Sequence, residues 1–407
     1  MTNCSENEIL ATMKTIKNLL FGKSLVGRIV IAILCGVALG LVLPDCGVRV
    51  LKTFNVFFAQ LLKFMVPLLI IGLVTPAIAD VGKGAGKMLV AVMVVSYFST
   101  VSAGFFAYGA SGVLLPHYIG QGAFEAAGNG KEFLPFFTLK IPPLCDVLTA
   151  LALSFMTGIG IVYTGSESLK RGAGDFGAIV KFAIMRVIIP GLPIYILTMI
   201  SEMTASGRLS AMAGVLFKVI GTGWGLTIAF LVVLYVVAGA VAGRNPFGCL
   251  WRMLPAYLTG LSIASSSAVI PVTLQCCERN GISKDVRDFT VPLCANVHMV
   301  GSTIKLLTSA FAISILYGFD MPVAKVANFV FMLAIAAVAA PGVMGGVLMA
   351  SVGLVESILG FTQEQTALLM TFYLALDGYG PAANVTGDGA VALALDRFFG
   401  HKGDSAL

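Results

Sequence analysis

Runs of about 20 consecutive apolar residues, the length that a helix needs to cross a bilayer, recur along most of this 407-residue chain. Hydrophobic residues make up 58% of the sequence and charged residues only 11%, whereas soluble domains carry about 25% charged residues. The mean hydropathy is +0.95. The chain is therefore predicted to be an all-α polytopic membrane protein in the lipid bilayer, and it carries no nucleic-acid-binding signature.

The N-terminal part, residues 1–243, contains a series of apolar runs that we expect to be transmembrane helices. The segment Pro116–Pro143 is mixed in composition and is expected to be an extramembrane loop. The runs are Leu25–Leu43, Phe54–Ala79, Met88–Leu115, Val147–Val162, Phe176–Ile200 and Leu216–Ala242.

After residue 243 the apolar runs are interrupted. Cys249–Cys277 contains SIASSSAVIP and Val330–Leu354 contains AAPGVMGG, and a long polar-bearing helix is expected after each, at Phe289–Leu316 and Thr366–Phe398. Corresponding breaks in two successive units are typical of inverted repeats with a mid-membrane binding site. Residues 244–407 are therefore expected to form two reentrant hairpins, each followed by a helix.

The distribution of basic residues predicts the orientation. With an internal N-terminus, most of the 26 Lys and Arg residues fall in cytoplasmic segments, as the positive-inside rule requires. The chain is therefore expected in the cell inner membrane with both termini cytoplasmic. Met1–Lys23 lacks an AxA-like cleavage site and is expected to be retained. The eight cysteines form no CxxC pair and are interpreted as unpaired packing residues.

The stretch from Tyr373 to Arg397 is apolar yet contains two acids and an amide. If it forms one helix, its polar residues and one proline share a face. Carboxylates inside a membrane are costly unless they face a cavity or a cation, so this face is a functional-site hypothesis. The residues on the face are Asp377, Pro381, Asn384 and Asp388.

Both interruptions could form ligand-binding hairpin tips. Ser265, Ser266 and Ser267 with free backbone amides could bind a carboxylate, although serines also simply permit close helix packing. The run Ala339–Gly346 can unwind over a ligand at low steric cost, although it could also be a plain turn. Between the hairpins, His298, Ser302 and Lys305 are predicted to share one helix face, with Asp388 or Asp377 as the partner of Lys305.

These motifs together resemble the dicarboxylate/amino acid:cation symporter family, which includes glutamate and neutral amino acid transporters. The resemblance rests on SSSAVIPVT, the PLCANVHMVGST helix, the Pro-Gly hairpin and NVTGD at Asn384–Asp388. It implies eight transmembrane helices plus two reentrant helical hairpins and an elevator-type transporter that assembles as a homotrimer. Residues 1–243 would then be the trimerisation scaffold with part of the transport domain, and residues 244–407 the transport-domain core.

The resemblance also implies a substrate-binding set. It consists of the first hairpin tip, the second hairpin tip and residues of the two polar helices. Asp377 would bind the substrate's α-amino group, and the serine tip its α-carboxylate. The full set is Ser265, Ser266, Ser267, Ser302, Pro341, Gly342, Val343, Asp377, Gly380, Pro381 and Asn384. Cation binding would fall to Asn384, Asp388 and Cys294.

The chain departs from the family pattern at three places. Gly380 stands where acidic amino acid carriers have an arginine, so a neutral or otherwise unusual substrate is expected. His298 and Val300 replace an asparagine and an aspartate, and Val101 replaces a hydroxyl, so one sodium site is expected to be absent. We hypothesise that Lys305 or a protonated His298 takes over the electrostatic role of that cation.

The sequence thus predicts a secondary active symporter that moves a small, neutral amino acid with a cation. A dicarboxylate carrier, proton coupling and a divergent receptor remain alternatives. No cofactor is expected beyond the coupling Na⁺ or H⁺. A channel would need a continuous polar pore, and an enzyme would need an acid, a base and a nucleophile together, so both classes are disfavoured.

The coupling hypothesis makes a prediction. Lys305→Met should change the ion dependence of transport, because it removes a fixed positive charge from the polar helix. Initial uptake rates measured against sodium and pH gradients test this. Unchanged coupling in a normally expressed variant would contradict the hypothesis.

Overall fold

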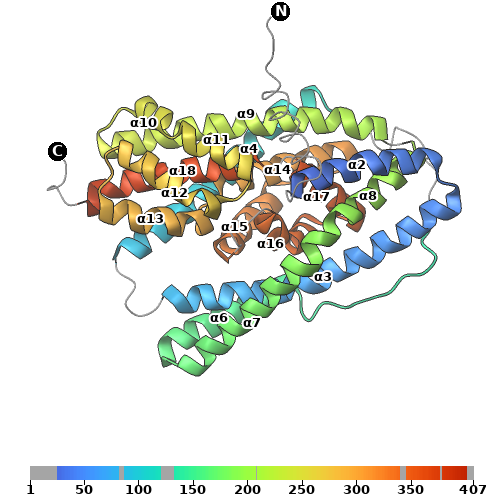
Figure 1. Ribbon diagram of the computed structural model, residues 1–407, viewed down its shortest axis with the longest axis horizontal. Coiled ribbons are helices and arrows are strands. Elements are labelled where there is room, and N and C mark those ends of the chain that lie inside the picture. Colours follow the sequence, from blue (N-terminus) through green and yellow to red (C-terminus); the bar gives the residue numbers. More distant parts are fainter. Residues whose placement is uncertain are drawn as a thin grey trace, which may run out of the picture.

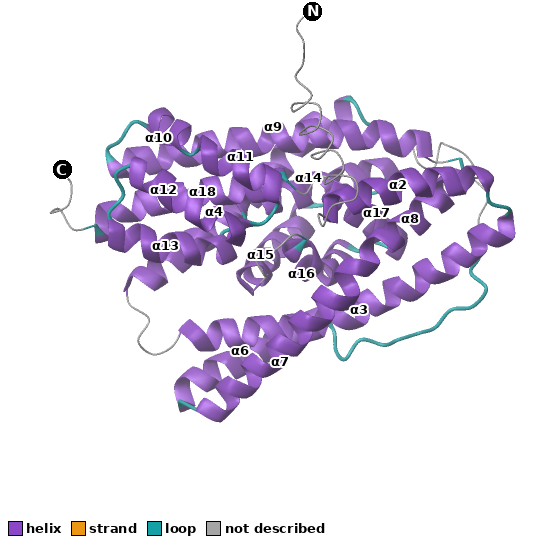
Figure 2. Ribbon diagram, in the orientation of Figure 1, coloured by secondary structure: helices purple, strands orange, loops and turns teal. Residues whose placement is uncertain are grey.

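The computed structural model describes residues 25–81, 87–120, 133–207, 209–339, 345–375 and 378–400. Within these residues every regular element is a helix and none is a strand (Figure 2). The all-α prediction is therefore confirmed for the described part of the chain.

The helices of the N-terminal part fall at the predicted apolar runs, with one difference. The fifth run is built from two helices that are joined by a π-helical segment, Ile184–Ile188, and bent by 43°. Pro190 and Pro193 lack backbone N–H groups and explain the bend. The helices are α2 (Leu25–Val42), α3 (Asp45–Val81), α4 (Lys87–Leu114), α6 (Val147–Thr164), α7 (Glu167–Ala183), α8 (Ile189–Ala205) and α9 (Leu209–Ala242).

The C-terminal part contains shorter helices separated by breaks. Before the first hairpin lies α10 (Pro246–Arg252). The others are α11 (Leu254–Ile263), α12 (Ser266–Arg279), α13 (Lys284–Val297), α14 (Val300–Tyr317), α15 (Val323–Ala339), α16 (Gly346–Leu354), α17 (Gln363–Ala375) and α18 (Tyr379–Phe399). A π-helical segment, Val355–Leu359, continues α16.

Both predicted hairpins are present as pairs of packed helices. In the first, α11 and α12 contact each other, and the chain reverses at Ala264, whose φ of 55° is in the left-handed region that L-residues rarely adopt. In the second, α15 packs against α16. Its tip, including Pro341, Gly342 and Val343, lies outside the described residues.

The sequence predicted two long, continuous polar helices. That prediction is wrong in one respect, because each helix is broken. The helix expected over Phe289–Leu316 is interrupted at His298 and Met299, which have extended and other non-helical backbone angles. The helix expected over Thr366–Phe398 is replaced by α17 and α18. Helical periodicity did not reveal the break at His298, because side chains of other helices, Thr100 and Asn384, accept the backbone hydrogen bonds freed there.

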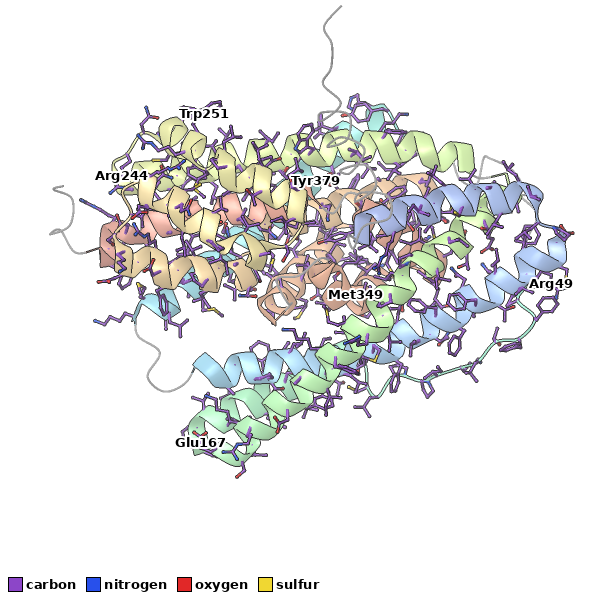
Figure 3. All side chains as sticks on the ribbon, viewed as in Figure 1. Arg49, Glu167, Arg244, Trp251, Met349 and Tyr379 are labelled. Atoms are coloured by element: carbon purple, nitrogen blue, oxygen red, sulfur yellow. The ribbon has the colours of Figure 1, made fainter. Side chains whose placement is uncertain are left out.

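α18 lies at the centre of one group of helices. It contacts α4, α9, α11, α12, α13 and α14, and it runs between them in Figure 1. A second group consists of α2, α3, α6, α7 and α8, which pack on one another. Figure 3 shows Tyr379 and Met349 in the interior, whereas Arg49 and Arg244 lie towards opposite ends. The division at residue 243 remains a prediction.

Among the described residues, three helical stretches are long and apolar enough to cross a membrane. They are Lys87–His117, Gly214–Ala242 and Lys284–Tyr317, and the bent pair α7–α8 would make a fourth. The predicted number of eight spans is therefore not established by length and composition alone.

The close approach of α14 to α18 generates a prediction. A Cβ atom at Gly301 of α14 would lie 2.5 Å from the Cβ of Ala383 and against the carbonyl oxygen of Gly380, both in α18. Gly301→Ala should therefore destabilise the fold by about 1–3 kcal/mol through overpacking. Thermal unfolding in detergent measures the effect.

Gly109→Ala in α4 is the matched control, because nothing lies within 4 Å of its added methyl group. It should leave the unfolding midpoint unchanged or raise it slightly, since alanine favours helix over glycine. Equal midpoints for Gly301→Ala and the wild type would contradict the inferred close contact.

Candidate functional site

The polar face predicted on the last helix is present in α18. Pro381, Asn384 and Asp388 recur at i, i+3 and i+7, which places them on one side of the helix. Pro381 belongs to the first turn, where its missing N–H leaves no helical bond unmade. Asp377 precedes the helix and lies outside the described residues, so its predicted role is unchanged.

Asn384 satisfies the free N-terminal end of α14. Its Oδ1 accepts hydrogen bonds from the backbone N–H groups of Gly301 (2.8 Å) and Ser302 (3.2 Å). Its Nδ2 donates to Ser302 Oγ at 3.0 Å and contacts Met299 Sδ at 3.3 Å. A helix starts with backbone N–H groups that have no helical partner, and here a side chain from another helix supplies the partner.

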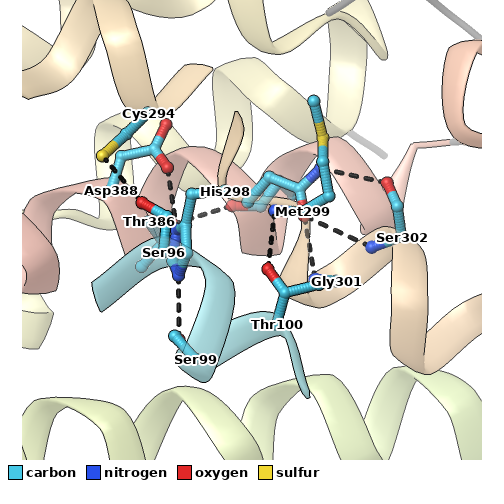
Figure 4. A network of polar contacts seen from close by, with 12 residues as sticks. Ser96, Ser99, Thr100, Cys294, His298, Met299, Gly301, Ser302, Thr386 and Asp388 are labelled. Carbon is cyan, nitrogen blue, oxygen red and sulfur yellow. Dashed lines mark hydrogen bonds and ion pairs between the residues drawn. The ribbon is translucent and has the colours of Figure 1, made fainter. Parts of the chain in front are cut away.

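His298 occupies the break before α14 and bridges two helices. Its Nδ1 lies 3.0 Å from Asp388 Oδ1 and its Nε2 lies 2.9 Å from Ser99 Oγ of α4 (Figure 4). Both His298 and Asp388 are fully buried. His298 therefore does not share a helix face with Ser302 and Lys305, because the chain leaves the helix at residue 298; that prediction is wrong.

A second neighbour of the break comes from α4. Thr100 Oγ1 accepts a hydrogen bond from the Met299 N–H at 3.4 Å. Ser96 Oγ lies 3.6 Å from Cys294 Sγ, one turn before His298 in α13. Sequence reasoning missed Ser96 and Ser99. The available signal was a group of polar residues in an otherwise apolar helix: Ser96 and Ser99 are three residues apart, and Thr100 follows directly.

Lys305 is fully buried in α14 and lies beside the break between α17 and α18. Its Nζ is 3.5 Å from the ring centroid of Tyr373 and 5.7 Å from that of Tyr379. A desolvated cation–π contact contributes about 2 kcal/mol or more, which offsets part of the cost of burying an ammonium group. Sequence reasoning missed both tyrosines, although they are the aromatic residues that flank the break.

The sequence predicted Asp388 or Asp377 as the partner of Lys305. Asp388 Oδ1 is paired with His298, and Lys305 lies instead at the other end of the polar face, next to Ser302 and Gly380. A pairing with Asp377 falls outside the described residues.

The first helix of the serine hairpin, α11, packs on the start of α18. A Cβ at Gly260 of α11 would lie 2.8 Å from the Cα of Ala382, and one at Gly378 would lie 2.5 Å from the carbonyl oxygen of Leu261. Ser266 is buried, and Ser267 Oγ donates to Asn296 Oδ1 at 3.4 Å. The hairpin is thus held against the helix that carries Asn384 and Asp388.

The donor atoms near Asp388 define what cation could bind there. Within the described part of the chain, Asp388 Oδ2 is buried and has no hydrogen-bond partner, so this oxygen is suited to a cation or a proton. The neighbouring His298 and Cys294 offer nitrogen and sulfur, whereas sodium prefers oxygen ligands. In the described segments, no three His, Cys, Asp or Glu side chains form a metal-binding group.

These features define the class of protein as a membrane transport protein. They are broken helices in an apolar chain, buried polar helix termini, and a buried carboxylate, imidazole and ammonium group. A family model for the sodium:dicarboxylate symporter family matches residues 25–398. The chain therefore belongs to this family of membrane transporters, which are not enzymes.

Curated relatives agree with this family. A serine/threonine transporter, SstT, of Streptococcus thermophilus is 28% identical over 348 residues, which cover 80% of this chain and 83% of the relative. Excitatory amino acid transporter 4 of Mus musculus is 28% identical over 288 residues, which cover 67% of this chain and 50% of the relative. Both relatives are named as amino acid transporters.

The contact between His298 and Asp388 generates a prediction. His298→Ala should lower the free energy of unfolding by about 3 kcal/mol or more, because it leaves a buried acid without its partner. In an Asp388→Asn background the same substitution should cost less, with a coupling energy of about 1–3 kcal/mol. Denaturant or thermal unfolding of the four proteins measures this.

His117→Ala is the control, because His117 is exposed and contacts only its own helix turn at Val113 O among the described contacts. Its unfolding should match the wild type. Additive effects of the His298 and Asp388 substitutions would show that the two side chains do not interact in solution.

Proposed function

We propose that this protein is a secondary active symporter that moves a small amino acid together with a cation. The observation that carries the proposal is the polar cluster around the two helix breaks, in which Asn384 of α18 binds the start of α14 beside Ser302. Both helix N-termini are positive ends of helix dipoles, and they lie next to the predicted amino-acid-binding residues. The names of the two relatives support an amino acid substrate.

The substrate could carry either a neutral or an acidic side chain, and each alternative has support. A neutral amino acid is favoured by Gly380, which carries no charge, and is consistent with the serine/threonine transporter among the relatives. A dicarboxylate or an acidic amino acid is favoured by the ammonium group of Lys305, whose Nζ would lie 3.4 Å from a Cβ at Gly380.

For the coupling cation, we propose Na⁺ with Asp388 and Asn384 as the key residues. The unpartnered Oδ2 of Asp388 supports this role within the described residues. Cys294, which lies one turn before His298, remains a proposed neighbour of the cation. Protons are the alternative coupling ion, because His298 is bonded directly to Asp388.

The proposed mechanism is alternating access by an elevator movement within a homotrimer. The separate packing of α2, α3, α6, α7 and α8 on one side and the helices around α18 on the other supports such a movement. The coupled cation drives transport because it binds more tightly to one state than to the other.

Asp388→Asn tests the cation assignment. Purified protein in liposomes should take up a radiolabelled amino acid faster under an inward sodium gradient. The substitution should remove that stimulation, because it removes the negative charge that stabilises the cation. Uptake is measured for neutral amino acids, acidic amino acids and dicarboxylates under sodium, potassium and proton gradients.

Asp320→Asn is the matched control, because Asp320 is exposed in the loop after α14. It should leave uptake unchanged. Equal sodium stimulation in Asp388→Asn and the wild type would refute the cation site, and the absence of uptake or binding of every compound tested would refute the transport function.

A further inference from the structure

Ser99 lies on a buried face of α4 that borders the break between α13 and α14. Ser96 and Thr100 share this face, and each of the three hydroxyls contacts a residue at or near the break. Ser99 differs from the other two because its partner is the side chain that is bonded to Asp388. Its Oγ lies 2.9 Å from Nε2 of His298, whose Nδ1 lies 3.0 Å from Asp388 Oδ1 (Figure 4).

Steric packing does not fix which way the His298 ring faces. The ring is enclosed on the α18 side, where a Cβ at Gly387 would lie 2.9 Å from its Cε1 atom. Turning an imidazole by half a rotation exchanges each nitrogen with a carbon of almost the same size, so an enclosed ring fits either way. In the turned orientation, carbon atoms would replace the nitrogens at both hydrogen bonds. The bonds to Ser99 and Asp388 therefore decide the orientation of the ring.

Within the described part of the chain, Ser99 is the only hydrogen-bond partner of His298 Nε2. An ionised carboxylate only accepts hydrogen bonds, so Nδ1 donates to Asp388. A neutral imidazole then accepts at Nε2 and the hydroxyl donates to it, whereas an imidazolium donates at Nε2 and the same hydroxyl accepts. Ser99 can therefore hold the ring in either charge state, and a side chain without a hydroxyl can hold it in neither.

The orientation of His298 in turn sets the orientation of Asp388. Because Oδ1 is bonded to the ring, Oδ2 is the oxygen left over, and it is buried without a hydrogen-bond partner among the described residues. Groups that hold a metal ligand in place without touching the ion change the metal affinity by about 10–100-fold when they are removed. A carboxylate that lost its fixed partner could turn, and a cation would no longer meet a prepared oxygen.

We infer that Ser99 is a positioning residue for the coupling cation: it orients His298, which holds Asp388 Oδ1 and thereby presents Oδ2 to the cation. The inference rests on the cation role proposed above for Asp388. It adds to that site a residue of α4 that acts through His298 rather than by binding the cation itself.

Ser99→Ala tests this role in liposomes. The sodium concentration that gives half-maximal uptake should rise about 10–100-fold, whereas the maximal rate at saturating sodium should stay close to that of the wild type, because Asp388 itself is unchanged. An unchanged half-maximal sodium concentration in folded Ser99→Ala would overturn the inference.

Ser102→Ala is the matched control. Ser102 is exposed on the same helix, and its Oγ donates to the carbonyl oxygen of Phe98 at 2.8 Å. The substitution removes a serine hydroxyl from α4 without touching His298, so the sodium dependence of uptake should equal that of the wild type.

The ring nitrogens of His298 report on its positioning directly. The chain has three histidines, so NMR of isotope-labelled histidine in a protein with His117→Ala and His401→Ala observes His298 alone. Adding Ser99→Ala should shift the Nε2 signal, and adding Ser102→Ala should not. An unchanged Nε2 signal would overturn the inference even if the sodium dependence of uptake changed, because Ser99 would then act by another route.

Two further outcomes have defined meanings. If Ser99→Ala does not fold, Ser99→Cys replaces it, because a thiol has nearly the same size but forms only weak hydrogen bonds. If wild-type uptake occurs but does not respond to sodium, the proposed cation role fails and the inference fails with it. A sodium response in the wild type that the Ser99 substitution leaves unchanged overturns the inference alone.

Discussion

The hydrogen-bonding needs of broken helices are the constraint on which this structure depends. A helix that ends inside an apolar region leaves backbone groups that no water can satisfy. Here the start of α14 is satisfied by Asn384 of α18, and the Met299 N–H by Thr100 of α4. Three helices far apart in sequence are thereby fixed to one another, and the site is formed where their polar groups meet.

The same constraint explains why the charged residues are concentrated in one zone. Burying a carboxylate or an ammonium group costs several kcal/mol unless it is paired or hydrogen-bonded. Asp388 is bonded to His298, which is held in turn by Ser99. Lys305 lies over Tyr373. Each charge therefore lies in a place prepared by neighbouring helices, and moving any one helix alone would disturb several polar contacts.

Sequence reasoning predicted the helical class, the two hairpins and the gathering of Ser302, Asn384 and Lys305, because hydropathy and polar interruptions are local signals. It did not predict the break at His298, because that break depends on partners from other helices, and it did not predict the break between α17 and α18. The expectation of a neutral substrate came from the resemblance, which places Gly380 where acidic amino acid carriers have an arginine. The nearby ammonium group of Lys305 belongs to the facing helix, and no periodicity along α18 could reveal it.

The small residues where α14 meets α18 have a steric consequence. Such residues at a helix interface let two backbones approach closely, and here the approach leaves no room for even one added methyl group at Gly301. The same close contact brings Asn384 within hydrogen-bonding distance of the α14 N-terminus. The polar cluster therefore depends on the lack of side-chain volume where these two helices meet.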